Sequence, residues 1–381
     1  MSMEPSCILF QNEDKTITLI DAPRSIESAQ GDCGGRRLIS SKPLEHPYPS
    51  VEPKSTKAIA NISKPSIRDL LLQRHLELAL NEIRKFHKGS WCLPRVTVDS
   101  RVPVHESKRQ RLTNLEDEEG SKGHRATEFK DEPMKLGDSF GNEVVYHRNS
   151  KPTPITCATV GPERTIVWVP PKSTILLGDI NTTRNIFSSC APKFDLIVLD
   201  PPWPNRSARR KHSYNISYGL SDIRLLLSSI PINDHLANGG MVCVWVTNKP
   251  ALHDMLLDEG EIFEEWGIQL VEEWIWIKVT TSGEPICDLD STWRKPYEVL
   301  LLGRNGRQEG STTSSENVRR RVIVAVPDLH SRKPNLKTML EPYLPLKYEA
   351  LEVFSRNITA GWWAWGNEVV KFQTYEHWTS D

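Results

Sequence analysis

The tetrapeptide Asp200-Pro201-Pro202-Trp203 is the stretch of the sequence best suited to chemistry. A carboxylate and a proline carbonyl both accept N–H bonds, so together they can hold a planar exocyclic amine as it attacks a sulfonium methyl. Trp203 adds an aromatic face on which a base can stack. The alternative interpretation is a strand that ends in a Pro-Pro turn with a core tryptophan. The aspartate before the prolines and the tryptophan after them favour methyl transfer to an amino group.

The apolar run that precedes this tetrapeptide predicts where it lies. Within Phe194–Leu199, the run Leu196–Leu199 is short, apolar and β-branched in the middle, which is typical of a central strand of a parallel sheet. Two prolines then prevent further ladder pairing. Since open α/β sheets bind ligands beyond the carboxyl ends of their strands, we expect the tetrapeptide at that edge.

Apolar runs alternate with helical patterns through the second half of the chain, which predicts an α/β fold with a doubly wound, mostly parallel sheet. The expected strands are Ser173–Leu177, Phe194–Leu199, Met241–Val246, Ile268–Val279, Tyr297–Gly303, Arg321–Val326 and Ala350–Phe354, preceded by Glu143–Tyr146 and Thr165–Val169. The expected helices are Thr182–Ser188, Ser221–Ser229, Pro250–Gly260 and Asn335–Glu341.

The pattern divides the chain into four parts. Residues 1–60 are rich in Gly, Ser and Pro, so we expect little order there beyond one strand, Thr16–Ile20. Residues 61–98 form a smaller, helical and basic region whose helix begins after Ser66, a good N-cap. Its basic side chains either contact phosphate or form a solvated face. Residues 99–149 are a charged linker, and residues 150–381 are the catalytic domain.

Composition limits the classes of function. The formal net charge is -1, so any binding of nucleic acid must come from local patches. Seven scattered cysteines without a C-x-x-C pair argue against a disulfide framework or a zinc site and suit a reducing compartment. Neither a signal peptide nor a membrane span is evident, so a soluble intracellular protein is expected. Lys108–Arg111 is a basic cluster that fits either nuclear import or a solvated linker.

The connection after Trp203 runs from Asn205 to Leu220 and is longer than usual for a compact domain. It combines cations with aromatic rings, as a site for a splayed-out nucleotide requires. A basic, flexible, solvated loop is the alternative. The candidate substrate-binding residues are Asn205, Arg206, Arg209, Arg210, Tyr214 and Tyr218.

Asp200–Trp203 together with Trp365-Gly366-Asn367-Glu368 resembles the MT-A70 family of adenine-N6 methyltransferases, over about Ser173 to Phe372. Asn205-Arg206-Ser207 and Lys295-Pro296-Tyr297-Glu298 most resemble its methyltransferase-like protein four branch. The resemblance implies a permuted Rossmann-like, S-adenosylmethionine-dependent domain. It also favours a catalyst, since the family's inactive partner subunits replace the tetrapeptide.

The same resemblance implies the site residues. Asp200, Pro201, Pro202 and Trp203 are expected to be catalytic, with Tyr218 beside the target base. The cofactor, S-adenosylmethionine, is converted to S-adenosylhomocysteine without a metal. Its expected contacts are Asp179, Ile180, Asp200, Lys295, Arg356, Asn357, Asn367 and Glu368. Without the resemblance, Asp179 equally well caps the next helix. The chain departs from the family at Ser355, where the family has glycine.

The expected substrate is adenosine in RNA, and the branch resemblance implies 2′-O-methyladenosine in a spliceosomal small nuclear RNA, the U2 species. Methylation of DNA adenine is the first alternative, and a non-catalytic nucleic-acid-binding subunit is the second. A protein-amide methyltransferase is a remote further alternative. We expect a nuclear location, with the cytoplasm as a second compartment. The apparent lack of a zinc-binding module favours action as a monomer.

Overall fold

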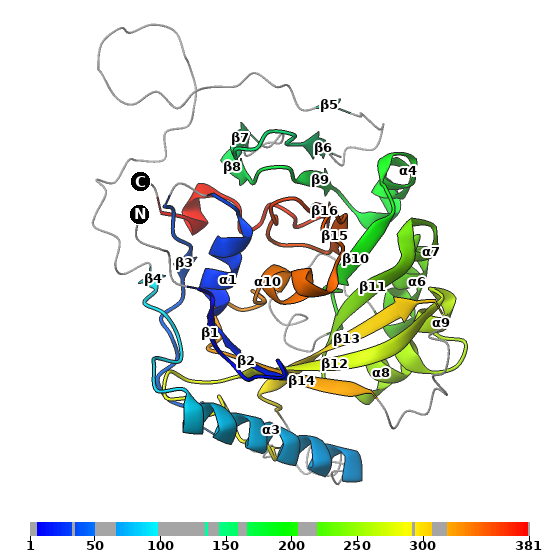
Figure 1. The fold of residues 1–381 in the computed structure, drawn as a ribbon. Helices are drawn as coiled ribbons and strands as arrows, with labels where there is room; N and C mark the ends of the chain where they lie inside the picture. The colour runs from blue at the N-terminus through cyan, green and yellow to red at the C-terminus, as the bar shows by residue number, and fades with distance from the viewer. Residues whose placement is uncertain are drawn as a thin grey trace, which may run out of the picture.

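One large mixed sheet organises the chain (Figure 1). The computed structural model describes residues 6–32, 35–49, 66–97, 134–135, 145–158, 166–204, 219–291, 294–306 and 318–379. Within these residues the sheet has 12 strands. From one edge to the other they are β1 (Ile8–Gln11), β2 (Ile17–Ile20), β14 (Arg319–Ala325), β12 (Ile268–Lys278), β13 (Tyr297–Asn305), β11 (Leu236–Val246), β10 (Phe194–Leu199), β15 (Ala350–Val353), β16 (Trp363–Gly366), β9 (Thr174–Leu177), β6 (Val145–Arg148) and β5 (Met134–Lys135).

The centre of the sheet is parallel: β11, β10, β15, β16 and β9 pair side by side in the same direction. The chain forms β9 and then β10, yet β15 and β16, which come last, fill the positions between them. The doubly wound α/β prediction is therefore confirmed. This order makes the carboxyl end of β10 a switch point, where connections leave toward both sides of the sheet and a ligand cleft is expected.

Helices cover both faces of the sheet, as the apolar composition of β10 requires. Ile197 and Leu199 pack in one core and Leu196 and Val198 in the other. The first face carries α3 (Ile67–Phe86), α4 (Ile180–Cys190), α6 (Leu220–Ser229), α7 (Ile232–His235), α8 (Pro250–Leu257) and α9 (Ile262–Glu265). The second carries α1 (Ala22–Ala29) and α10 (Lys337–Leu340), which η3 (Glu341–Tyr343) follows. Because side chains alternate along a strand, Asp200 continues the second face, toward α1 and α10.

Short elements complete the fold around the sheet. Strands β3 (Ile39–Ser40) and β4 (Val96–Thr97) pair in parallel, and β7 (Ile155–Ala158) and β8 (Ile166–Val169) pair antiparallel. The 3₁₀ helix η4 (Tyr375–His377) lies near the C-terminus. Within the described ranges, no helix has the length and apolar character needed to cross a bilayer.

The expectation of poor order over residues 1–60 is wrong for residues 6–32 and 35–49. Strand β2 pairs in parallel with β14, and Leu19 and Ile20 are fully buried. Helix α1 follows at once, with Asp21 as its N-cap. A four-residue strand has a weak sequence signal, and its partner lies about 300 residues away along the chain, so local pattern does not reveal it. The strand expected at Glu143–Tyr146, inside the linker assigned to residues 99–149, is observed as β6, which pairs with β9.

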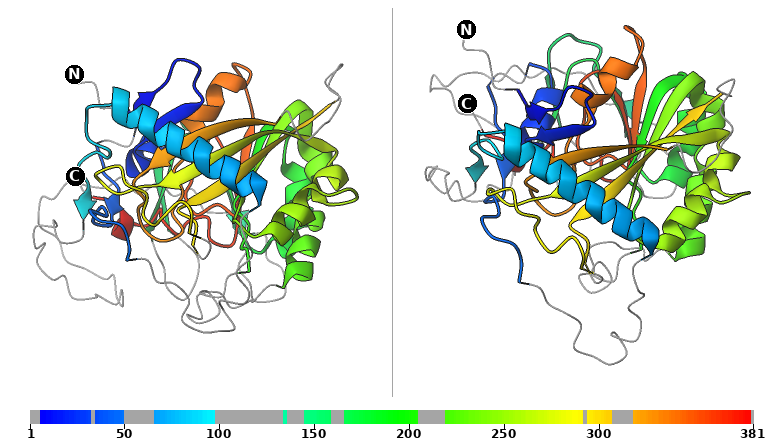
Figure 2. Two further views of the ribbon diagram at one scale, coloured as in Figure 1. Left: turned by 90° about the horizontal axis from the view of Figure 1, so that it is seen from below. Right: turned by 60° about the horizontal axis from the view of Figure 1, so that its bottom comes forward.

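The helix expected after Ser66 is confirmed as α3. The Ser66 hydroxyl accepts a bond from the Asp69 amide, and the Asp69 carboxylate accepts one from the Ser66 amide. The buried side of α3 is formed by Leu76, Ala79, Leu80 and Ile83, whereas Ile67, Leu70, Leu71 and Leu78 are exposed. The Arg68 guanidinium lies 2.7 Å from the Glu273 carboxylate of β12, which ties α3 across the sheet (Figure 2).

The burial of β2 generates a stability prediction. Leu19→Ala should lower the free energy of unfolding by about 2–5 kcal/mol, because it removes a fully buried side chain and leaves a cavity. Leu71→Ala, at an exposed position of α3, should change it by less than about 0.5 kcal/mol. Urea unfolding of both variants measures the two values. Equal effects would mean that β2 does not belong to the core.

Candidate active site

Five sheet strands and one loop bring polar side chains to the same edge of the sheet. Asp200 follows β10, Arg356 lies in the loop after β15, and Asn367 follows β16. Strand β13 runs the other way, so its first residues, including Glu298, lie at this edge, beside the end of β12 at Lys278. The loop after β14, which carries Lys333, leaves from the same edge. The sheet order therefore gathers residues that are far apart in the sequence around the end of β10.

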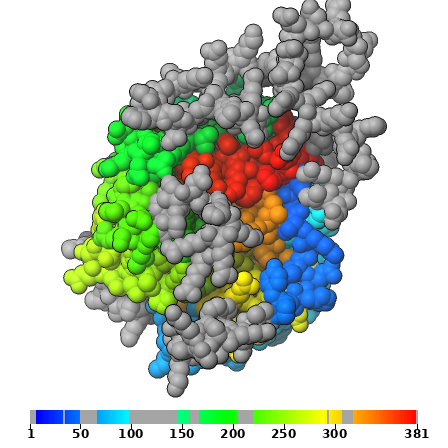
Figure 3. Space-filling model, turned by 180° about the vertical axis from the view of Figure 1, so that it is seen from behind, coloured from blue at the N-terminus to red at the C-terminus, as the bar shows by residue number. Residues whose placement is uncertain are grey.

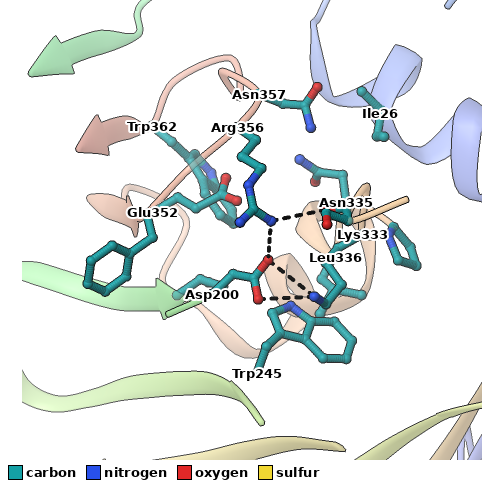
Figure 4. A pocket seen from close by; sticks show the side chains of 14 residues that line it. Ile26, Asp200, Trp245, Lys333, Asn335, Leu336, Glu352, Arg356, Asn357 and Trp362 are labelled. Carbon is teal, nitrogen blue, oxygen red and sulfur yellow. Dashed lines mark hydrogen bonds and ion pairs between the residues drawn. The ribbon is translucent and has the colours of Figure 1, made fainter. Parts of the chain in front are cut away.

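A pocket opens at this edge, on the face of the sheet that α1 and α10 cover (Figure 4). Strands β10, β11 and β15, the loop after β14 and the loop after β15 all contribute to it. Its lining residues are Ile26, Val198, Asp200, Trp245, Ser331, Lys333, Pro334, Asn335, Leu336, Glu352, Phe354, Arg356, Asn357 and Trp362. Of the predicted site residues, Asp200, Arg356 and Asn357 line the pocket together.

Two cations hold the Asp200 carboxylate. The Lys333 ammonium nitrogen lies 3.0 Å from Oδ1 and 3.2 Å from Oδ2. The Arg356 guanidinium contacts the same carboxylate, with Nη1 3.2 Å from Oδ2 (Figure 4). Asp200 is only 13% exposed. A carboxylate withdrawn from water this far requires such partners, because an unpaired buried charge is costly.

The two cations are themselves shared with further acids. Lys333 lies 3.2 Å from Glu298, which also pairs with Lys278. Burial alone would raise the pKa of Glu298, but Lys333 and Lys278 outweigh it and hold this pKa at about 2. Burial would lower the pKa of Lys333, but Asp200 and Glu298 outweigh it and raise this pKa above the usual value. Both groups therefore stay charged at neutral pH.

Arg356 has a similar second partner. Its Nε lies 2.9 Å from the Glu368 carboxylate, which Lys371 also contacts at 2.6 Å. Burial acts to raise the pKa of Glu368, and the two cations overcome this and lower it. Glu368, a predicted cofactor residue, thus orients Arg356 toward Asp200 in this structure.

Glu352 behaves differently from the paired acids. It lines the pocket from β15, in register with Val198 of β10. Burial first, and then the neighbouring Asp200, raise the pKa of Glu352 to about 8, although Arg356 acts in the opposite direction. A protonated carboxyl at neutral pH can donate a hydrogen bond and adds no negative charge beside Asp200.

Backbone geometry explains why serine replaces glycine at position 355. The residue in the left-handed region is Phe354, with φ +59°, not Ser355. The Phe354 amide donates to the Trp365 carbonyl at 2.7 Å, and the Ser355 hydroxyl donates to the Asn357 carbonyl. Gly366 is the constrained glycine: its φ is +143°, and a Cβ there would lie 3.2 Å from the Phe354 Cα.

The rest of the tetrapeptide forms a fixed corner after Asp200. The Asp200 amide donates to the Val353 carbonyl at 3.3 Å, and the Trp203 amide donates to the Pro201 carbonyl at 2.8 Å. The indole Nε1 of Trp203 donates to the Trp245 carbonyl of β11 at 2.7 Å. Trp203 is half-buried and packs against the main core, so its ring is held at the edge of the sheet.

The remaining predicted cofactor residues lie at the neighbouring strand ends. Asp179 caps α4 by accepting a bond from the Asn181 amide at 2.9 Å, and Ile180 is buried. The Gly178 amide donates to the Gly366 carbonyl at 3.1 Å, so Asp179 and Asn367 leave the sheet from adjacent strands. Asn367 is exposed. In this structure Asp179 is therefore the N-cap of α4.

The lysine that contacts Asp200 is Lys333, which was not among the predicted site residues. Lys295 precedes β13 and is not among the residues that line the pocket; its charge instead acts on Asp69 of α3. The role of Lys295 as a donor contact stays a prediction, whereas Glu298 of the same stretch lies beside Lys333. The local sequence does not mark Lys333 as a site residue, because β14 ends at Ala325 and Lys333 meets Asp200 only in the folded sheet.

The predicted substrate-binding residues cannot be placed. Asn205, Arg206, Arg209, Arg210, Tyr214 and Tyr218 lie outside the described residues. The described chain stops at Pro204 and resumes at Gly219, which precedes α6. Their role stays a prediction.

Comparison of the sequence with known proteins identifies the family. Residues 194–368 match the family description "MT-A70". A protein of Cryphonectria parasitica named "N6-methyladenosine RNA methyltransferase MTA1" is 40% identical over 98% of this chain and 95% of its own length. The chain belongs to the MT-A70 family. A protein of the same printed name from Pyricularia oryzae is 38% identical over 97% of this chain and 96% of its own. The Mus musculus "N(6)-adenine-specific methyltransferase METTL4" is 38% identical over 55% of this chain and 44% of its own.

Membership in the MT-A70 family confirms the resemblance stated above and makes this chain a methyltransferase. The matched region contains Asp200, Lys333 and Arg356, so most of the pocket lies within the family region. The elements β1, β2, α1 and α3 lie before the matched region, yet they are part of the same structure.

The pKa of Glu352 generates a prediction about pH. It lies near 8 in the folded protein, above the 4.5 of a free side chain, so the folded state retains a proton that the unfolded chain releases. This contribution to stability is complete below about pH 4.5 and is lost as the pH rises toward 8. Glu352→Gln lacks the titration, so its free energy of unfolding relative to wild type should increase from about pH 5 to about pH 8.

Urea unfolding across that range measures the difference, and Glu349→Gln is the matched control. Glu349 is exposed just before the same strand. A difference for Glu352→Gln that stays constant with pH would mean that Glu352 ionises normally.

Proposed function

We propose that this protein transfers a methyl group from S-adenosylmethionine to N6 of adenosine in RNA. The observation that carries the proposal is the Asp200–Lys333–Arg356 cluster, which lies in a pocket and leads directly into Pro201-Pro202-Trp203. Two relatives that match nearly the whole chain carry names for RNA methylation, which supports RNA as the substrate class.

The pocket has the groups that the donor requires. The methionyl part of S-adenosylmethionine has one ammonium and one carboxylate, and the cluster offers carboxylates for the first and Lys333 or Arg356 for the second. Asn357 Oδ1 lines the pocket and is buried without a hydrogen-bond partner, so it can accept a bond from a ribose hydroxyl. S-adenosylmethionine supplies an electrophilic methyl on its sulfonium. Arg356, Asn357, Asn367 and Glu368 are the proposed donor-side residues, with Lys333 in place of Lys295.

The tetrapeptide Asp200–Trp203 binds the methyl acceptor, the adenine base. An adenine N6 amine has two N–H groups, which Asp200 and a carbonyl of the Pro201-Pro202 pair can accept. The Pro201 carbonyl already accepts one bond from the Trp203 amide, but a carbonyl oxygen has two lone pairs. Holding both N–H groups orients the nitrogen lone pair and stabilises the positive charge that develops on it. The hydrogen bond from Trp203 to Trp245 fixes the indole as a stacking surface beside this position.

Within RNA, we propose 2′-O-methyladenosine of a spliceosomal small nuclear RNA as the target and the nucleus as the place of action. The support is the resemblance of Asp200–Ser207 and Lys295–Glu298 to the methyltransferase-like protein four branch. DNA adenine is the alternative substrate. Since the target base must leave its stack, single strands and bulges cost less to methylate than duplex.

The substrate assay compares four oligonucleotides of one sequence with labelled donor: RNA with adenosine, RNA with 2′-O-methyladenosine, single-stranded DNA and duplex DNA. Nucleoside mass spectrometry identifies the N6-methyl product. Product from RNA, greatest with 2′-O-methyladenosine, supports the full proposal. Product from unmodified RNA alone overturns the finer target, and product from DNA alone overturns RNA as substrate. No product from folded protein that binds donor overturns catalysis.

Asp200→Asn should lower kcat by at least about 100-fold, because the amide has one N–H-accepting oxygen instead of two and no charge. Affinity for RNA should stay within about twofold of wild type, since the nucleotide's backbone contacts lie elsewhere. Asp234→Asn, at an exposed position of α7, is the matched control. An equal loss of RNA affinity and turnover would mean that Asp200 does not act on the reacting amine.

Lys333→Met should weaken donor binding by at least about tenfold, because it leaves Asp200 and Glu298 without a shared cation and removes the partner of the donor carboxylate. Lys295→Met should leave donor affinity within about twofold of wild type. Calorimetric titration with S-adenosylmethionine measures both. The reverse order of effects would restore Lys295 as the donor lysine.

A further inference from the structure

Helix α1 reaches the pocket from the N-terminal part of the chain, before the region that the family match covers. Ile26 lines the pocket and is 1% exposed. Figure 4 shows it beside Asn335 and Asn357, on a separate ribbon from the sheet. On the surface seen in Figure 3, the N-terminal segment borders the segments that follow β14 and β15. A helix far from the tetrapeptide in sequence thus forms one wall of the donor site.

The first loop that α1 holds is the one that carries Lys333. The Asn335 amide, two residues after Lys333, donates to the Ser25 hydroxyl at 2.9 Å. Ser25 is buried, and its hydroxyl in turn donates to the Ala22 carbonyl at 2.6 Å. Removal of this hydroxyl would leave a partly buried main-chain N–H of the loop without its protein acceptor.

The same loop is held a second time by residues 38–41. Arg332, next to Lys333 and 2% exposed, donates to the Ile39 carbonyl at 3.0 Å and to Asp328 at 2.6 Å. Asp328 accepts from the Ser41 amide at 2.8 Å and from its hydroxyl at 3.1 Å. The loop from 328 to 335 is therefore fixed at both ends by the N-terminal segment.

The second loop that α1 holds is the one that carries Arg356 and Asn357. The Gln30 side-chain amide donates to the Ile358 carbonyl at 2.8 Å, and the Ala360 amide donates to the Ala29 carbonyl at 2.8 Å. Both contacts come from the C-terminal end of α1. One helix thus holds the two loops whose cations meet on Asp200.

The helix is itself held rigidly. Asp21 caps it by accepting from the Arg24 amide at 2.8 Å and accepts from the Leu93 amide at 2.7 Å. The buried Glu27 pairs with Arg24 and with Arg37, each at 2.9 Å. Such a network leaves α1 little freedom relative to the chain around it.

We propose that residues 21–30 and 38–41, which we call the N-terminal brace, position Lys333 and Arg356 for donor binding, and that Ser25 is a positioning residue of the methyltransferase. The proposal rests on the donor site proposed above. It implies that the family region 194–368 does not make a complete donor site without the brace. A brace that only stabilised the fold would contribute to stability and leave the affinity of the folded protein for its donor unchanged.

The test compares Ser25→Ala with Ser28→Ala in the full-length protein. Ser28 is exposed on the same helix, so the control makes the same chemical change away from the loops. Ser25→Ala should raise the Kd and the KM for S-adenosylmethionine by about three- to tenfold, because the Asn335 segment loses its anchor. The kcat at saturating donor and the Kd for RNA should stay within about twofold, and Ser28→Ala should match wild type throughout.

A lower thermal midpoint for Ser25→Ala with unchanged donor Kd would overturn the brace and leave α1 a purely structural element. Equal weakening of S-adenosylmethionine binding and RNA binding by Ser25→Ala would overturn the brace as well. If Ser25→Ala does not fold, Ser41→Ala provides the same comparison, since it removes one bond to Asp328 and keeps the main-chain bond. A wild-type protein that binds no S-adenosylmethionine would refute the proposed function rather than the brace.

Discussion

The ion pairs on Asp200 are the constraint on which the site depends. Four acids, Asp200, Glu298, Glu352 and Glu368, lie at one edge of the sheet, where water is largely excluded. Removing a charge from water costs several kcal/mol unless a partner compensates. Lys333 and Arg356 each compensate two acids, and Glu352 avoids the cost by staying protonated. A ligand that enters must therefore exchange partners with this network, which selects for a molecule with charges of both signs.

The sheet order makes the network possible. Asp200, Glu298, Lys333 and Arg356 come from β10, β13, the loop after β14 and the loop after β15. Because the last strands of the chain insert between β9 and β10, the loop after β15 leaves the sheet directly beside the tetrapeptide. Both cations thus reach Asp200 from segments that follow it by more than 130 residues. The permuted strand order is therefore what places Lys333 and Arg356 beside Asp200.

Much of this was visible in the sequence. The run before Asp200 is apolar throughout because β10 is covered on both faces, so the strand and its abrupt end at two prolines could be predicted. Helices with clear caps, such as α3 after Ser66, were predicted for the same local reason. Lys333 was missed because the residues that identify it as a site lysine, Asp200 and Glu298, become its neighbours only in the folded sheet. Strand β16 was missed because it has only four residues and ends in a glycine, and its burial comes from β9 and β15.

The pairing of β2 with β14 has a consequence for how the chain is made. Residues 17–19 pair with residues 322–324, which are synthesised about 300 residues later. At ordinary rates of translation, about 5–20 residues per second, the apolar strand β2 waits on the order of tens of seconds outside the ribosome before its neighbour exists. During that interval Leu19 and Ile20 are open to other chains, so a nascent chain of this protein is a natural client for a chaperone that covers short apolar segments until release.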